Sequence, residues 1–360
     1  MRVLLWMAGA GIIPGGHKTQ LEQTSRHLQI LGVDAEVSFE DNPDIEGFDL
    51  VHGFSLSPSH IRRCRQRGLP TALSTIYWSK AYTSSQQSIG NRMATLQTRA
   101  HMAMVLLRSA ALGQHVVKCE ALVERIQMTR IAYEMVDLLL PNSELEAITI
   151  KAELGTTTPY HIVPNAVDHI RFNTNRVTTY ERDHVLYAGR IEPHKNQLGL
   201  IKAMSRSTIP VVILGPPHPH HTPYYEECKR CATSNIKLLP GVPHEELPDL
   251  YRAAKVHVLP SWFETTGLVS LEAALCGSNI VTTDRGYARE YFQDFAWYCD
   301  PSDPRSIRRA IEDAYRSPTR TGLQDRILNN FTWEHTAQAT LEGYEQLLRR
   351  TKSHVQNLLP

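Results

Sequence analysis

Two glutamates eight positions apart form the most informative pattern in the chain. Glu264 lies in a turn-like stretch, Gly267 follows it, and Glu272 falls within an apolar run typical of a helix. A fully helical segment would separate the acids by roughly 12 Å, whereas carboxylates that flank one bond lie about 5–9 Å apart. Because ionised carboxylates only accept hydrogen bonds, we interpret the pair as holding opposite ends of one elongated, hydroxyl-rich ligand. A helix N-terminal acid plus a surface acid is the structural alternative.

Two basic residues follow a predicted strand. Arg190 and Lys195 come after Gly189, which ends an apolar stretch at residues 184–188. Cations fixed beside a leaving phosphate stabilise the negative charge that develops on it, and they need no metal ion to do so. The pattern therefore predicts an anion site, with two solvated loop cations as the alternative.

A glycine pair near the N-terminus indicates a second anion-binding loop. Gly15 and Gly16 lie between a predicted strand at residues 3–8 and a predicted helix at residues 19–31. Glycine lets backbone amides come close to an anion, and the helix N-terminus adds its dipole. The loop is not a G-x-G-x-x-G fingerprint, because Gly11 is followed by Ile-Ile-Pro.

The elements that must position these residues alternate along the chain. Predicted strands cover residues 3–8, 34–39, 49–53, 70–76, 137–140 and 161–168, and then 184–188, 211–214, 236–239, 256–259 and 279–282. Helical patterns between them, including a long one at residues 91–136, predict two mostly parallel sheets covered on both faces. Ligands of such sheets lie beyond the carboxyl ends of the strands. We therefore expect an α/β protein of two Rossmann-like domains with a cleft between them.

Size and charge narrow the function further. The 360 residues suggest two domains, and the polar stretch at residues 173–183 is the best linker. The net charge of +1 argues against wholesale nucleic-acid binding. No run of 18 apolar residues occurs, so we expect no transmembrane helix, and we interpret the short apolar N-terminus as a strand rather than a signal peptide.

Two smaller motifs allow different interpretations. Cys228 and Cys231, after several histidines, are spaced as zinc ligands can be, although the same spacing places them on one face of a helix at residues 224–233. The six cysteines are scattered, which fits a reducing cytoplasm. The basic cluster at residues 62–67 is typical of a solvated helix face, with contact to anionic lipid headgroups as the alternative.

The motifs, taken in order, resemble the retaining glycosyltransferases of family GT4, the glycosyltransferase group 1 type with a GT-B fold. The matching pieces are Gly15-Gly16, Pro141-Asn142-Ser143, Val163 to Asp168 with Phe172, Tyr187 to Asn196, Leu214-Gly215, Gly241-Val242, Glu264 to Gly277 and Phe331 to Trp333. Each piece alone is weak, but the ordered set is specific. The resemblance implies that Arg190 and Lys195 contact the donor diphosphate, that Glu264 lies near the donor sugar, and that Glu272 binds the ribose hydroxyls.

The resemblance also assigns the remaining site residues. We predict the catalytic residues Arg190, Lys195 and Glu264, and the donor-binding residues Gly15, Gly16, Gly189, Val242, Thr266, Gly267, Leu268 and Glu272. Gly267 and Leu268 would offer backbone amides at a helix N-terminus, and Val242 would contact the base through its main chain. No Asp-x-Asp metal triplet occurs, so we expect neither a metal nor a cofactor beyond the donor.

The acceptor side departs from the family pattern. Many members carry a histidine at the end of the strand that here reads Ser74-Thr75, and a retaining front-face mechanism does not require one. His52 is a candidate substitute, although a lone histidine is more often a hydrogen-bonded structural residue. Aromatic faces stack on sugars or pack in cores, and a lysine can meet an anionic acceptor. We predict the acceptor-binding residues His52, Tyr77, Trp78, Lys80 and Asn165.

These patterns combine into one prediction. A metal-independent, retaining glycosyltransferase would move a hexose-type sugar from a UDP- or GDP-sugar to a hydroxyl of a carbohydrate, glycolipid or other small molecule. Residues 1–172 would bind the acceptor and residues 173–333 the donor, with a C-terminal helix at residues 334–360 returning to the first domain. We expect a cytoplasmic protein, with peripheral contact at the inner membrane face as an alternative. A catalytically inactive sugar-nucleotide-binding protein and a GT-B epimerase are the rival functions.

Overall fold

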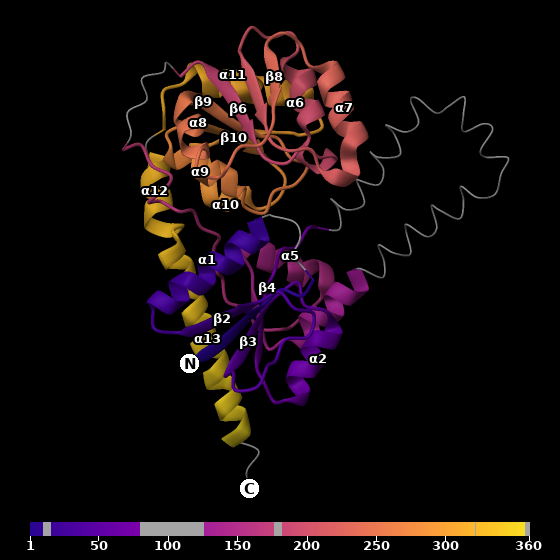
Figure 1. Cartoon of the computed structure of the whole chain (residues 1–360), viewed down its shortest axis with the longest axis vertical. Helices are drawn as coiled ribbons and strands as arrows, with labels where there is room; N and C mark the ends of the chain where they lie inside the picture. Colours follow the sequence, from indigo (N-terminus) through magenta and orange to yellow (C-terminus); the bar gives the residue numbers. More distant parts are fainter. Residues whose placement is uncertain (10–15, 80–125, 176–181, 321, 357–360) are drawn as a thin grey trace, which may run out of the picture. The chain divides into compact units, whose positions relative to one another are not determined.

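The chain divides into two compact α/β units in a computed structural model (Figure 1). The model describes residues 1–9, 16–79, 126–175, 182–320 and 322–356, with side-chain detail to residue 351. The first unit comprises residues 1–163 and 337–360, and the second comprises residues 164–336. Phe172 packs in the core of the second unit, although the sequence analysis assigned residues through 172 to the first domain.

The N-terminal unit contains a five-stranded parallel sheet in the order β2-β1-β3-β4-β5. Its strands are β1 (Arg2–Trp6), β2 (Asp34–Ser38), β3 (Leu50–Phe54), β4 (Thr71–Ser74) and β5 (Leu138–Leu140). Every residue of β3, β4 and β5 is buried, because helices cover both faces of a parallel sheet and apolar side chains are favoured on each.

Helices from distant parts of the chain cover the two faces of this sheet. One face carries α1 (Gly16–Ile30) and α13 (Trp333–Gln356), and the other carries α2 (Pro58–Gln66), the helical residues 126–135 and α5 (Glu144–Leu154). The C-terminal helix α13 thus packs on the N-terminal sheet, as the resemblance implied, and Figure 1 shows it in yellow against these strands. Its Tyr344 is fully buried there.

The C-terminal unit contains a six-stranded parallel sheet in the order β11-β10-β9-β6-β7-β8. Its strands are β6 (His184–Ala188), β7 (Val211–Leu214), β8 (Ile236–Leu239), β9 (Ala254–Leu259), β10 (Asn279–Thr283) and β11 (Trp297–Cys299). The helices α6 (Gln197–Met204), α7 (Thr222–Cys231) and α11 (Pro304–Arg316) cover one face. The helices α8 (Leu247–Ala253), α9 (Leu268–Leu275), α10 (Ala288–Phe292) and α12 (Gly322–Asn330) cover the other.

Two predictions of secondary structure need comment. The strand predicted at residues 161–168 is wrong: only isolated bridges form nearby, from Tyr160 to Leu139 and from Val167 to Thr332. Pro159, just before this segment, and Pro164, within it, have no N–H to donate, so a ladder cannot extend through them. Most of the long helix predicted at residues 91–136 lies outside the described residues. Within the described part of the chain, no helix has the length and apolar character needed to cross a bilayer.

Candidate functional site

The predicted cation and the first predicted acid meet in the C-terminal unit. Lys195 ends the short 3-10 helix η1 (Pro193–Lys195) after β6, and Glu264 lies in the loop after β9, the neighbouring strand. Lys195 Nζ donates to Glu264 Oε1 at 2.6 Å, and the side chains are 25% and 8% exposed. The carboxyl ends of two parallel strands therefore bring together residues that are 69 positions apart in the sequence.

The electrostatics keep Glu264 charged. Burial on its own would raise the pKa of this carboxyl, but the positive charge and hydrogen bond of Lys195, with further contributions from His194 and Ser261, lower the pKa overall. Burial also lowers the pKa of His194 to about 4, so the imidazole is neutral at pH 7. Lys195 is then the cation that balances the buried carboxylate. His194 and Ser261 gave no signal in the sequence beyond lying near Lys195 and Glu264.

A glycine that the sequence analysis missed fixes the backbone of Glu264. Gly286 forms an isolated parallel bridge with Glu264, and the flanking Tyr287 N donates to Glu264 O at 2.8 Å. A Cβ atom on Gly286 would lie 2.1 Å from that carbonyl oxygen, and the residue has a φ of 104°. No other residue type fits this crossing without a shift of the backbone.

Arg190 follows the carboxyl end of β6, two residues after Ala188. The strand end is shaped by Gly189 and Gly215, since a Cβ on Gly215 would lie 2.0 Å from Gly189 O. The Arg190 side chain is 33% exposed, and its Nε lies 3.5 Å from Glu192 Oε1. Glu192 also faces His218, whose Nε2 is 4.0 Å from Oε2. A half-buried guanidinium next to a carboxylate can still meet an anion bidentately through its outer nitrogens.

The second predicted acid lies on helix α9, which begins after Gly267. Gly267 has a φ of 82°, which supplies the left-handed turn into the helix, so Glu264 lies outside the helix and Glu272 within it. The Glu272 side chain is 12% exposed. Its Oε1 lies 3.1 Å from His244 Nε2, and its Oε2 accepts from Tyr251 OH at 3.2 Å. Both partners escaped the sequence analysis because they lie in the separate segment 244–251.

The loop before α9 is held by a residue predicted to contact the acceptor. Asn165 belongs to the C-terminal unit, and its Nδ2 donates to Thr266 Oγ1 at 2.9 Å. Its backbone N–H donates to Tyr291 OH at 3.0 Å. Asn165 thus supports the turn that presents Gly267 and Leu268. Val242 lies in the loop between β8 and α8. It is partly buried and packs on the face of the C-terminal sheet that α9 also covers.

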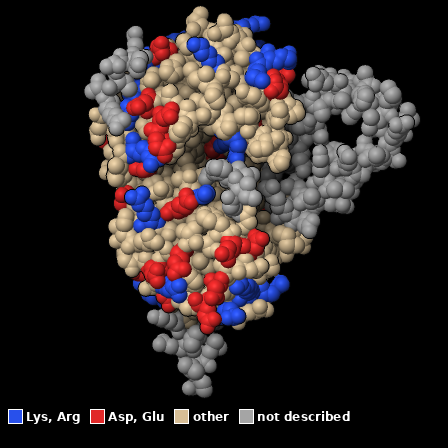
Figure 2. All heavy atoms as spheres, in the orientation of Figure 1, with Lys and Arg blue, Asp and Glu red and all other residues tan. Residues whose placement is uncertain are grey.

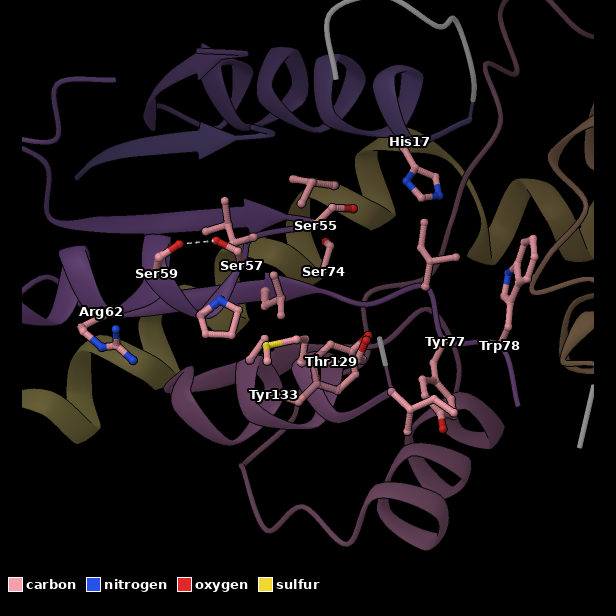
Figure 3. Close-up of a pocket in the computed structure, with 18 residues that line it drawn as sticks. His17, Ser55, Ser57, Ser59, Arg62, Ser74, Tyr77, Trp78, Thr129 and Tyr133 are labelled. Carbon is pink, nitrogen blue, oxygen red and sulfur yellow. Dashed lines mark hydrogen bonds between the residues drawn. The ribbon is translucent and has the colours of Figure 1, made fainter. Parts of the chain in front are cut away.

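The predicted sites of the N-terminal unit are only partly described. Gly16 is the first residue of α1, whereas Gly15 and Lys80 lie outside the described residues. A pocket of about 730 Å³ opens at the carboxyl ends of β3 and β4. Figure 3 shows Arg62 at one end of this pocket and His17 and Trp78 toward the other.

The pocket combines hydroxyl groups with apolar walls. Its lining includes Ser55, Ser57, Ser59, Ser74 and Thr129 together with Leu56, Leu73, Ile76, Ile126 and Ala132, and the described lining residues include no aspartate or glutamate. Tyr77 lines it too, and its OH donates to Glu153 Oε2 at 2.8 Å while its backbone N–H donates to Glu146 Oε1 at 2.7 Å. Trp78 is 36% exposed. A neutral or anionic molecule with hydroxyl groups suits this lining.

His52 lies under the pocket rather than in its lining. The residue is 1% exposed on β3, with Nδ1 2.7 Å from Tyr344 OH and Nε2 2.8 Å from Ser74 Oγ. Burial lowers the pKa of His52 to about 3. This geometry favours the hydrogen-bonded structural role over direct contact with an acceptor, although Ser74 does line the pocket.

The cysteine pair lies on helix α7, and the basic cluster at residues 62–67 lies at the end of helix α2. Cys228 and Cys231 lie on α7, where Cys228 is buried and its pKa is raised to about 12 by burial. Among the described residues, no three histidine, cysteine, aspartate or glutamate side chains gather as metal ligands would. On α2, Cys64 is buried and Arg63 donates to Pro43 O at 2.7 Å. Figure 2 shows acidic and basic side chains interspersed on the face in view.

Comparison with known proteins finds similarity to glycosyltransferases, mainly in the C-terminal unit. Residues 171–330 match the family model described as glycosyl transferases group 1. O-antigen chain mannosyltransferase B of Escherichia coli is 31% identical over 46% of this chain and 46% of its own length. D-inositol 3-phosphate glycosyltransferase of Pseudarthrobacter chlorophenolicus is 30% identical over 62% of this chain and 58% of its own. The first-named alignment thus spans about half the length of that relative.

Solved structures share the fold of both units. Sucrose-phosphate synthase of Thermosynechococcus elongatus superposes with a TM-score of 0.73, at 16% identity over 97% of this chain and 100% of that chain. Anabaena HepE in complex with UDP gives 0.69, at 15% identity over 96% and 100%. These similarities confirm the expected GT-B fold of two Rossmann-like α/β sheets, while the family match concerns the C-terminal unit.

Proposed function

Because residues 171–330 match the family model described as glycosyl transferases group 1, we propose that the whole chain is a retaining glycosyltransferase. Its donor would be a UDP- or GDP-hexose and its acceptor a hydroxyl group of a carbohydrate, glycolipid or other small molecule. The observation that carries the proposal is the Lys195–Glu264 ion pair, with Nζ and Oε1 2.6 Å apart, at the carboxyl ends of β6 and β9. Arg190 lies at the same edge of the sheet.

The cations would act on the leaving group. As the bond between the sugar anomeric carbon and the phosphate oxygen breaks, its electron pair stays on the diphosphate. Arg190 and Lys195 stabilise that charge by electrostatics and hydrogen bonds, in the role that a metal ion plays in other enzymes. Glu264 holds the Lys195 ammonium in place by one hydrogen bond, which leaves two N–H groups to donate.

The acids would hold the donor at two points. Glu264 accepts hydrogen bonds from sugar hydroxyls, and Glu272 accepts them from the ribose. The acceptor hydroxyl attacks the anomeric carbon from the face that the diphosphate leaves. Attack from that face retains the configuration of the anomeric carbon. The departing phosphate oxygen takes the acceptor proton, so no protein base is required.

The donor and acceptor classes rest on separate observations. HepE was solved with UDP and with UDP-glucose, which supports a nucleotide-diphosphate sugar as donor here. The N-terminal pocket, with hydroxyl groups, aromatic rings and no carboxylate in its described lining, supports an uncharged or anionic acceptor. Stacking on Trp78 and Tyr77 would favour a sugar ring.

Donor screening followed by transfer assays tests the proposal. We expect UDP- or GDP-hexoses to raise the melting temperature, since a ligand at 100 times its Kd adds about 2.7 kcal/mol of stability. Sugar transfer to an acceptor panel should follow, with retained anomeric configuration by NMR. A folded Arg190→Ala, Lys195→Ala double variant with unchanged turnover would contradict the assigned roles.

The same assays separate the two rival functions. Tight donor binding without transfer or hydrolysis across the panel would indicate a sugar-nucleotide-binding protein that has lost catalysis. Conversion of the donor into its epimer, without any acceptor, would indicate an epimerase. Formation of a glycosylated product discards both.

A further inference from the structure

The acid at the ribose end of the proposed donor site is held by two neighbours. Tyr251 OH donates to Glu272 Oε2 at 3.2 Å, and His244 Nε2 lies 3.1 Å from Oε1. Each carboxylate oxygen has about two lone-pair sites, so each keeps one for a ligand. A carboxylate oriented in this way can accept two neighbouring hydroxyl groups, which is the chemistry that a ribose presents and a 2′-deoxyribose lacks.

Arg171 determines which nitrogen of His244 carries the hydrogen. Arg171 Nη1 lies 2.8 Å from His244 Nδ1, and a guanidinium can only donate. Nδ1 must therefore accept, so the hydrogen of the neutral imidazole sits on Nε2 and points at Glu272. The ring of Phe172 packs edge-on at 5.2 Å and limits rotation of the imidazole.

His244 also links the acid to the loop that carries the predicted base contact. Val242 and His244 belong to the same connection between β8 and α8, whereas Glu272 lies on α9. The hydrogen bond between His244 and Glu272 spans 28 positions of sequence. Loss of this bond would uncouple the loop from the carboxylate, which Tyr251 would still contact.

We propose that His244 is a positioning residue that orients the Glu272 carboxylate toward the ribose hydroxyls of the donor, and that Arg171 holds it in the tautomer that does so. The inference rests on the proposed function, since it requires a nucleotide in the C-terminal unit. Nothing in the reaction passes through His244 itself.

Protonation of His244 would disrupt this arrangement. The hydrogen bond with Glu272 raises the pKa of His244, opposed by burial and by the charge of Arg171, while Glu245 acts in the raising direction. Tyr251, the other group facing Glu272, stays neutral, since burial raises its pKa well above the ordinary value. The neutral imidazole is present above the raised pKa and is lost as the pH falls through it. An imidazolium cannot accept from Arg171.

The test is the ribose preference, measured as the ratio of the Kd of 2′-deoxy-UDP to that of UDP by calorimetry. The ratio cancels the titration of the phosphates, which both probes share. At pH 8 we expect a preference on the order of tenfold for the wild type. His244→Ala should lower it at least threefold. His244→Gln should retain most of it, because the amide oxygen accepts from Arg171 while the amide nitrogen donates to Glu272.

The pH profile distinguishes positioning from a general structural role. Between pH 8 and pH 5.5 the ratio should fall for the wild type and stay flat for His244→Gln. Arg171→Leu should move the midpoint to higher pH, because it removes a cation that opposes protonation. The matched control is His161→Gln, which removes a histidine 3.9 Å from Glu342 in the other unit and should change neither ratio nor profile.

The outcomes separate the two proposals. UDP binding with an unchanged ratio in a folded His244→Ala variant would overturn the role of His244, as would equal losses in the Ala and Gln variants. Failure of the wild type to bind UDP or 2′-deoxy-UDP moves the test to GDP and 2′-deoxy-GDP. Failure with both pairs would overturn the proposed function itself.

Discussion

The predicted sites of the two units differ in the chemical groups that form them. In the C-terminal unit the site consists of polar and charged groups that are paired around two carboxylates with little exposure, with Lys195 on Glu264 and His244 on Glu272. In the N-terminal unit the pocket is lined mainly by hydroxyl, apolar and aromatic groups, with Arg62 at one end, and the buried Glu146 is not among its lining residues. A charged leaving group demands fixed charges, whereas recognition of a neutral ring does not. We therefore expect substitutions to act mainly on turnover in one unit and on acceptor affinity or folding in the other.

Gly286→Ala should break the charged site most severely. Its Cβ would lie 2.1 Å from Glu264 O, and the residue has a positive φ. We expect a loss of at least about 3 kcal/mol in the free energy of unfolding, measured in denaturant, or failure to fold. Gly32→Ala is the matched control, because it has a φ of 82° with nothing within 4 Å. Equal losses in both variants would mean that the crossing of Gly286 with Glu264 is not the cause.

Lys195→Ala should remove leaving-group stabilisation and leave Glu264 without its cation. We expect kcat to fall at least tenfold and up to roughly 10²-fold, in line with the loss of one charge-stabilising donor. The rate of sugar transfer at saturating donor measures this. Lys202→Ala, an exposed lysine on the nearby helix α6, should leave kcat unchanged. A full rate in Lys195→Ala would remove this residue from the mechanism.

Glu146 should make the stability of the N-terminal unit depend on pH without affecting donor binding. Burial raises its pKa to about 7, although Tyr77, Asn142 and Thr75 donate hydrogen bonds to it. Its contribution to stability is therefore full below the unfolded pKa of about 4.5 and declines as the pH rises toward 7.

Stability measured from pH 4.5 to pH 8 should show this dependence. Relative to Glu146→Gln, the wild type should lose about 2 kcal/mol across that range, measured as the difference in the free energy of unfolding. Glu144→Gln, on the exposed side of the same helix, is the control that should show no such trend. Parallel curves for wild type and Glu146→Gln would contradict the raised pKa.

Trp78→Ala should give the smallest effect and should act only on the acceptor. Loss of a stacking face costs about 1 kcal/mol, so we expect the acceptor KM to rise roughly fivefold while the donor Kd is unchanged. Tyr160→Ala removes a comparably exposed aromatic ring that does not line the pocket. A change in donor affinity would contradict the assignment of acceptor binding to the N-terminal unit and donor binding to the C-terminal unit.

The sequence predicted the charged site better than the uncharged one. The signal for the charged site lies in residue types and spacing after the strands β6 and β9 and within helix α9. These segments carry Arg190, Lys195, Glu264 and Glu272. The serines of the N-terminal pocket have no distinctive spacing, because they come together only when β3, α2 and β4 pack. His244 went unnoticed for a similar reason: its partners Arg171 and Glu272 lie far away in the chain.

The division of the chain has a consequence for synthesis on the ribosome. The second unit is one continuous stretch, residues 164–336, and can form as soon as it emerges. The first unit folds later, because the buried Ala337, Tyr344 and Leu347 that complete one face of its sheet are synthesised after the whole second unit. Until then Val3 and Leu5 lack their cover. Nascent chains stopped before residue 337 should consequently be substrates for chaperones that hold exposed apolar surface.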